Sequence, residues 1–110
     1  SEKIAPALQK IAQNPAADLS VDELAALCYV SKPRFFALFK KFTGTSPMAY
    51  KNAACMEAAA KYLISFSNRS VEEIAYEFRF SSPVYFARLF KKHFGVSPSA
   101  YRKSVENDKL

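Results

Sequence analysis

Apolar residues recur at helical spacing in two segments of this chain. In each segment they follow the i, i+3, i+4, i+7 pattern that gathers side chains on one face of a helix. The positions are Phe35, Leu38, Phe39 and Phe42 in the first segment, and Phe86, Leu89, Phe90 and His93 in the second, where a histidine takes the fourth place. Gly44 and Gly95 then provide a left-handed stop. The pattern predicts two amphipathic helices with largely aromatic inner faces.

A shorter helix is predicted in front of each of these. Ser20 with Glu23, and Ser70 with Glu73, have the S-x-x-E spacing of a capping box at a helix N-terminus. The apolar residues that follow are Val21, Leu24, Ala25 and Leu27 in the first case, and Val71, Ile74, Ala75 and Phe78 in the second. Brief turns around Tyr29 to Ser31 and Arg79 to Ser82 separate the short helix from the longer one.

These elements form a repeat. The stretch that begins at Ser20 returns from Ser70, 50 residues later, and at the matching Tyr50 and Tyr101 the offset is 51. The second copy therefore has one extra residue near Ser81 or Ser82. A repeat of this length indicates two copies of one supersecondary unit.

Two further helices frame the units. Ile4, Leu8 and Ile11 predict an amphipathic helix from Glu2 to Gln13. Between the units, Pro47 to about Ser65 has a continuous helical pattern that would be about 27 Å long. Its expected packing residues are Tyr50, Met56, Tyr62 and Leu63. A helix of this length could hold two others near the ~34 Å spacing of successive major grooves of DNA.

The charge favours a polyanionic partner. The 110 residues carry 16 Lys and Arg against 10 Asp and Glu, a formal charge of +6. Eleven of the basic residues fall in two windows without acids, 32–51 and 79–103, which contain the two longer helices. A short capped helix, a tight turn and a second helix with basic surroundings is the layout of a DNA-binding helix-turn-helix.

Other classes of protein fit less well. The half-hydrophobic composition favours a packed fold, and the lack of an eighteen-residue apolar run or secretory signal predicts a cytoplasmic protein. Cys28 and Cys55 lack metal-site spacing and are expected to be buried reduced thiols. The single histidine, His93, is expected to be structural or at the surface. We therefore expect neither an enzyme nor a bound cofactor or metal.

A helical wheel shows which side chains would face DNA. Opposite the aromatic faces lie Pro33, Ala37 and Lys40 in one helix, and Val84, Arg88 and Lys91 in the other. Arg88 can make two hydrogen bonds to guanine, whereas Ala37 offers only apolar contact, for example to thymine methyls. The full set of base-reading candidates is Pro33, Arg34, Phe36, Ala37, Val84, Tyr85, Ala87 and Arg88. The first of the two longer helices either reads bases or only binds the phosphate backbone of DNA.

Lysines and helix N-termini are expected to bind phosphates, which position a protein without reading sequence. The candidates are Ser31, Lys32, Lys40, Lys41, Ser46, Ser82, Lys91, Lys92, Ser97 and Arg102. Tyr50 and Tyr101 are expected instead to pack beneath the preceding helix.

The second unit resembles the AraC/XylS family of bacterial transcription regulators. The shared motifs are an Ile-Ala pair at 74–75, a Phe-Ser turn at 80–81, F-x-R-x-F-K-K-x-F-G from Phe86, and S-P-x-x-Y-R from Ser97. The first unit is similar but looser. The chain differs from many family members at Tyr29 and Arg79, where glycine is frequent, and around Ala53 and Cys55, where basic residues are usual.

The resemblance implies an all-α fold of about seven helices. Two helix-turn-helix subdomains with homeodomain-like three-helix units would span 1–45 and 67–110, with a linker helix at 46–66. It also implies a sequence-specific regulator that inserts two recognition helices into adjacent major grooves of double-stranded DNA. RNA polymerase and a separate sensing or dimerising domain are the further partners implied, with no membrane. The alternative is a helical protein-interaction module that has lost base reading, which the apolar residues Pro33, Phe36, Ala37 and Val84 would suit.

Overall fold

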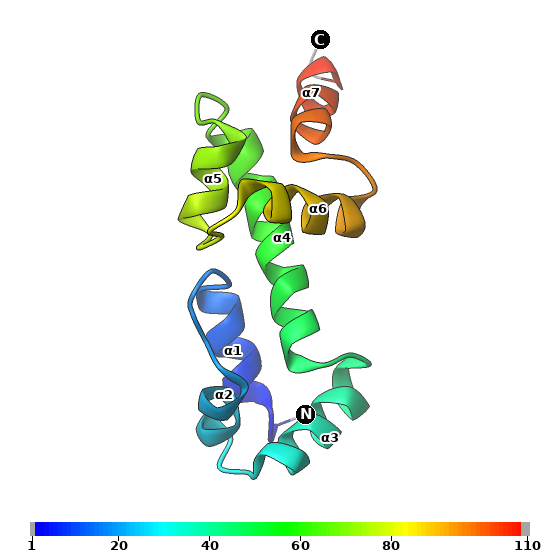
Figure 1. Ribbon diagram of the computed structural model, residues 1–110. Helices are drawn as coiled ribbons and strands as arrows, with labels where there is room; N and C mark the ends of the chain where they lie inside the picture. The colour runs from blue at the N-terminus through cyan, green and yellow to red at the C-terminus, as the bar shows by residue number, and fades with distance from the viewer. Residues whose placement is uncertain (1, 109–110) are drawn as a thin grey trace. The chain divides into compact units, whose positions relative to one another are not determined.

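The computed structural model describes residues 2–108, and Ser1, Lys109 and Leu110, the ends of the predicted domain, lie outside them. Seven helices and no strands make up this described part (Figure 1). Their bounds are α1 Ala5–Gln13, α2 Val21–Leu27, α3 Lys32–Thr43, α4 Pro47–Ser65, α5 Val71–Glu77, α6 Pro83–Phe94 and α7 Pro98–Asp108. The predicted all-α fold is therefore confirmed. No helix within residues 2–108 is long and apolar enough to cross a lipid bilayer.

The chain divides into two compact units, and the division falls inside α4. The first unit ends at Ala54 and the second begins at Cys55, so each unit contains one copy of the repeat and one part of α4. Within the first unit, α1 packs against α2 and α2 against α3; within the second, α5 packs against α6 and α6 against α7.

The core of the first unit is built from three helices and the α1–α2 connection. Ile4, Ala7 and Ile11 lie next to Leu24, Ala25, Cys28, Phe35 and Phe39, with Leu19 closing one side. Leu8, Tyr50 and Ala54 pack against this cluster while remaining partly exposed. The amphipathic N-terminal helix is confirmed, although it begins at Ala5 rather than Glu2.

Besides Pro98 in the first turn of α7, the buried residues of the second unit come from α4, α5 and α6, together with the residue that follows α5. They are Cys55, Met56, Ala59, Ala60, Leu63, Ile74, Ala75, Phe78, Phe86 and Phe90. Tyr62 meets Phe78 edge-on at 5.0 Å between ring centroids. Cys28 and Cys55 are buried reduced thiols, as predicted.

The two turns hold non-glycine residues in the left-handed region. Tyr29 has φ +56° and Arg79 has φ +69°, at the places where the sequence offered no glycine. An L-residue in this region costs roughly 1–2 kcal/mol. The surrounding hydrogen bonds hold the conformation: Val30 N–H donates to Ala25 O, and Phe80 N–H to Ala75 O.

The structure also identifies the extra residue of the second copy. Val30 and Phe80 make the same backbone hydrogen bond, at an offset of 50, while Ser31 and Ser82 cap the following helices at an offset of 51. Ser81 is therefore the inserted residue, and it lengthens the turn without changing the helix after it.

The two predicted capping boxes differ. In α5 the box is complete: Glu73 N–H donates to Ser70 Oγ, and Ser70 N–H donates to Glu73 Oε1, both at 3.0 Å. In α2 the Ser20 hydroxyl accepts from Glu23 N–H, but the Glu23 carboxylate accepts from that hydroxyl instead of the Ser20 backbone. The prediction of a reciprocal box was therefore wrong for the first copy.

Glu73 makes the second unit sensitive to acid. Hydrogen bonds from the Ser70 backbone and then from its side chain, with a smaller contribution from the charge of Arg69, hold the pKa of Glu73 below its ordinary value. A carboxyl with a lowered folded-state pKa stabilises fully above the unfolded pKa of about 4.3 and loses this effect as pH falls through the folded value.

We therefore expect Glu73→Gln to lower stability at pH 7, with a difference from wild type that shrinks as the pH falls below the unfolded pKa of about 4.3. Urea unfolding followed by circular dichroism over this range measures it. Glu72→Gln, in the same first turn of α5, is the matched control because it removes the same charge but leaves the box intact. A difference that stays constant with pH would contradict the assignment.

Candidate nucleic-acid interface

Helices α3 and α6 are built alike from end to end. Each has 12 residues and a serine N-cap: Ser31 Oγ accepts from Arg34 N–H at 3.4 Å, and Ser82 Oγ accepts from Tyr85 N–H at 3.2 Å. Gly44 and Gly95, at φ +80° and +82°, end them in the left-handed conformation, as predicted. Every residue of α3 therefore has a counterpart in α6 at an offset of 51.

Two phenylalanines fix the inner face of each helix. Phe35 and Phe39 in α3, and Phe86 and Phe90 in α6, are fully buried. The helix that follows adds a tyrosine: Tyr50 meets Phe39 edge-on at 5.4 Å, and Tyr101 meets Phe90 at 5.5 Å between centroids. The predicted packing role of both tyrosines is confirmed.

The buried face is narrower than the sequence pattern indicated. Phe42 is 49% exposed, and its counterpart His93 is also exposed. Neither belongs to the core, which corrects the prediction for the fourth position of each pattern. His93 instead packs edge-on against Phe94 and brings Nε2 within 3.3 Å of Glu57 Oε1 in α4. Sequence reasoning missed Glu57, since nothing in the local pattern connects α4 with α6.

The opposite face is open to solvent in both helices. Of the base-reading candidates, Pro33, Arg34, Phe36, Ala37, Val84, Tyr85 and Arg88 are exposed, and Ala87 is half-buried. Val84 is 70% exposed and lies in the first turn of α6. Neither α3 nor α6 has an acidic residue in its own first turn that would neutralise the positive end of the helix.

Counterpart positions on this face differ in chemistry. Ala37 in α3 corresponds to Arg88 in α6, and Phe36 corresponds to Ala87. The ring of Tyr85 lies 6.2 Å from that of Phe80, which in turn packs on buried Phe86. The turn residue Phe80 therefore helps to fix the position of Tyr85. Arg34 and its counterpart Tyr85 can both form hydrogen bonds, so the chemistry of the two exposed faces differs most at Ala37 and Arg88.

The cationic candidates gather at the ends of the two helices. Lys40, Lys41, Lys91 and Lys92 are exposed in the last turns. Lys32 Nζ lies 3.6 Å from Asp22 Oδ1, with both side chains largely in solvent. Asp22 belongs to α2 and lies outside the acid-free window 32–51, but the fold brings its carboxylate next to Lys32. The positive charge of Lys32 is therefore partly neutralised.

The serines before α4 and α7 cap these helices as predicted. Ser46 Oγ accepts from Ala49 N–H at 3.2 Å, and Ser97 Oγ accepts from Ala100 N–H at 3.1 Å. The first-turn N–H groups of a helix have no partner inside it, which makes these two N-termini suitable for an anion.

Arg102, one of the phosphate candidates, has another role in the structure. Its Nε donates to Leu63 O at 2.9 Å and its Nη2 donates to Phe66 O at 3.4 Å. These carbonyls are at the C-terminal end of α4, which lacks helical partners for its last carbonyl groups. The guanidinium therefore joins α7 to the end of α4, and we leave Arg102 out of the proposed interface.

Removing this contact is expected to destabilise the second unit. Arg102→Ala should lower the free energy of unfolding by about 1–2 kcal/mol, because a part-buried hydrogen bond from a charged donor to Leu63 O and an exposed one to Phe66 O are lost. Lys51→Ala, at the counterpart position in the first unit, is the control and should change stability by less than about 0.5 kcal/mol. Equal effects in urea unfolding would contradict the capping role.

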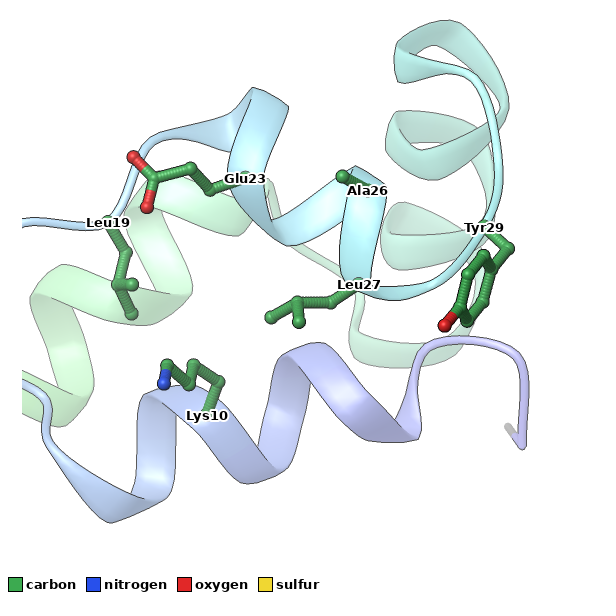
Figure 2. A pocket seen from close by; sticks show the side chains of 6 residues that line it. All are labelled: Lys10, Leu19, Glu23, Ala26, Leu27 and Tyr29. Carbon is green, nitrogen blue, oxygen red and sulfur yellow. The ribbon is translucent and has the colours of Figure 1, made fainter.

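A shallow groove lies on another side of the first unit (Figure 2). Leu27, which is 40% exposed, lies between Lys10 of α1 and the ring of Tyr29, which is 92% exposed. Glu23, Ala26 and Leu19 complete the lining. None of the predicted base or phosphate contacts lies in this groove. Within residues 2–108, no three His, Cys, Asp or Glu side chains gather as a metal site would require.

The geometry is that of a protein with two helix-turn-helix units. In each unit, one helix is anchored by buried aromatic rings and exposes its opposite side to solvent. A family model described as a helix-turn-helix domain matches residues 24–104. An uncharacterized HTH-type transcriptional regulator of Haemophilus influenzae is 35% identical over 104 residues, covering 94% of this chain and 35% of the relative. The chain spans about a third of the length of the curated relatives it matches.

Solved structures share the fold. A transcriptional regulator from Chromobacterium violaceum, described as having an AraC-type DNA-binding domain, is 28% identical with a TM-score of 0.86, covering 93% of this chain and 90% of that one. The DNA-binding domain of AdpA, a global transcriptional factor solved in complex with a target DNA, is 29% identical with a TM-score of 0.84, covering 98% and 96%. The chain belongs to the AraC-type helix-turn-helix family.

Proposed function

We propose that this chain binds double-stranded DNA sequence-specifically, as the DNA-binding part of a bacterial AraC-family transcription regulator. The observation that carries the proposal is the pair of matched helices, α3 and α6, each anchored by two buried phenylalanines and open on its other side. Helices of this kind present their N-terminal residues to base edges in the major groove.

The two helices would enter adjacent major grooves, over a site of roughly 20 base pairs. The repetition of the unit on one chain supports this arrangement, since a second reader on a separate subunit is then unnecessary. Base contacts would come from Arg34, Tyr85 and Arg88, with apolar contacts from their neighbours. Phosphates would be bound by Lys40, Lys41, Lys91 and Lys92, together with Ser31, Ser46, Ser82 and Ser97 at helix N-termini.

The full-length protein is proposed to have further partners. The relatives are about three times as long as this chain, which leaves room for a sensing or dimerising domain. Regulation of transcription in a bacterial cytoplasm would bring the complex to RNA polymerase. None of these partners is needed for the test of DNA binding, because the chain contains both proposed recognition helices.

Selection of bound duplexes from a random pool tests the proposal. We expect two enriched half-sites about one helical turn apart, with an affinity that falls roughly 100- to 1,000-fold between 50 and 200 mM salt if four to six phosphates are contacted. The alternative, a protein-interaction module, predicts no enriched motif and little salt dependence of partner binding. Enrichment of no sequence would sink the regulator proposal.

A further inference from the structure

The exposed face of α3 includes an apolar patch, and the hydrogen-bonding side chains of that face, Arg34, Lys40 and Lys41, lie beside it. Pro33 and Ala37 are exposed, and Phe36 is 39% exposed beside them. None of these side chains has a donor or acceptor. At 100° per residue, Ala37 lies opposite the buried pair Phe35 and Phe39, with Pro33 about 40° from it.

Positive charge surrounds this apolar face. Arg34, Lys40 and Lys41 are exposed on the same side of α3, and the first turn contains no acid. Such a rim favours a polyanion over an apolar protein surface, since the cations would have to be desolvated against a partner without countercharges. The partner must therefore combine phosphates at the rim with an apolar group at the centre.

The major groove offers one such apolar group. Thymine presents its C5-methyl there, and the same position is occupied in 5-methylcytosine, whereas cytosine and both purines present no methyl. Proline and alanine lose no side-chain rotamer freedom when they are covered, and a phenylalanine loses little. An apolar contact with a methyl group can therefore be made at a small ordering cost.

We infer that the first unit reads the 5-methyl groups of pyrimidines through Pro33, Phe36 and Ala37, where the second unit has Arg88, the counterpart of Ala37, for hydrogen-bonded reading. The inference rests on the proposed function. It names the 5-methyl group of pyrimidines as the chemical group that gives the first half of the binding site a sequence preference. It also predicts a response to cytosine methylation, because 5-methylcytosine would replace thymine in that half-site.

The rigidity of α3 supports contact reading of this kind. Its start is held by the Ser31 cap, and its inner face by Phe35 and Phe39, whose rings lie 5.4 Å apart. A short apolar side chain can reach a methyl group only if the helix backbone is held at a defined depth. The buried aromatic rings fix this depth independently of any hydrogen bond that Arg34 makes to a base.

The experiment uses duplexes enriched from the random pool, in which one chemical group of a base is changed at a time. Replacement of thymine by uracil removes only the methyl and leaves the hydrogen-bonding edge unchanged. We expect affinity to fall about four-fold for each contacted methyl in the half-site of the first unit. A change from thymine to cytosine should lower affinity further, and 5-methylcytosine should recover part of the loss.

Protein variants assign the effect to α3. Phe36 and Ala37 are exposed, so Phe36→Ala and Ala37→Ser should both fold, which circular dichroism checks. In each variant, the loss of affinity caused by replacing thymine with uracil should nearly disappear. Arg88→Ala identifies the other half-site by loss of its guanine preference, and it should retain the uracil penalty in the first. The matched control duplex carries uracil only outside both half-sites.

The outcomes separate the inference from the function on which it rests. If uracil-containing and thymine-containing duplexes bind equally while the selected motif remains specific, methyl reading is wrong and the regulator proposal stands. If no duplex is preferred at any salt concentration, both fail. A uracil penalty that persists in the two α3 variants would assign methyl reading to another part of the chain and would overturn the inference.

Discussion

Replacement of Phe39 by alanine is expected to lower the free energy of unfolding by about 3–5 kcal/mol. The ring is fully buried, lies 5.4 Å from both Phe35 and Tyr50, and belongs to the core that joins α1, α2 and α3. Its removal would leave a cavity in a unit of small size, where one such loss is a large part of the total stability.

The matched control lies three residues away in the same helix. Phe42 fits the apolar pattern of α3 equally well but is 49% exposed, with Lys41 over its ring at 5.5 Å. Phe42→Ala should therefore cost less than about 1.5 kcal/mol, since half of the ring is already in water. Urea unfolding followed by circular dichroism measures both variants. Equal losses would contradict the division of this helix into a buried and an exposed side.

Arg88→Ala is expected to lower affinity for the selected DNA by about five- to 150-fold, which corresponds to 1–3 kcal/mol. Arg88 is exposed, faces away from buried Phe86 and Phe90, and is the single arginine of α6. Its guanidinium can donate two hydrogen bonds to guanine O6 and N7. The preference for one guanine should disappear from the selected motif.

Two controls separate base reading from charge. Arg88→Lys retains the positive charge but not the paired donors, so the guanine preference should weaken almost as much as in the alanine variant. Lys91→Ala should instead lower affinity for all sequences alike and reduce the salt slope by about one. Binding measured by fluorescence anisotropy at several salt concentrations distinguishes them. An unchanged motif with Arg88→Ala would assign that residue to a phosphate.

Much of the fold follows from signals that act over three or four residues. Ser70 with Glu73 marks the start of α5, Gly44 and Gly95 mark the ends of the longer helices, and the structure has each where the sequence predicts it. These signals are local because a cap or a left-handed stop satisfies backbone groups of its own turn. Because the second unit repeats the first, the same local signals predict the helices of both units.

The exposure of the proposed interface was also predictable. Ala37, Val84 and Arg88 lie opposite the aromatic stripe on a helical wheel, and the structure leaves them open to solvent. The contacts that they make with DNA stay a prediction, as does the division into subdomains at 45 and 66. The residue types indicate which contacts these side chains can make, but the DNA that they would contact is not part of the chain.

Tertiary packing decided the features that depend on distant segments. The i, i+7 positions Phe42 and His93 fit the apolar pattern but remain exposed, and His93 finds Glu57 of α4 as its neighbour. Arg102 resembles a surface cation in sequence, yet its guanidinium binds the carbonyls of Leu63 and Phe66 across 36 or more residues. Periodicity states which side chains share a face of a helix. Only the neighbouring helices determine how much of that face is covered.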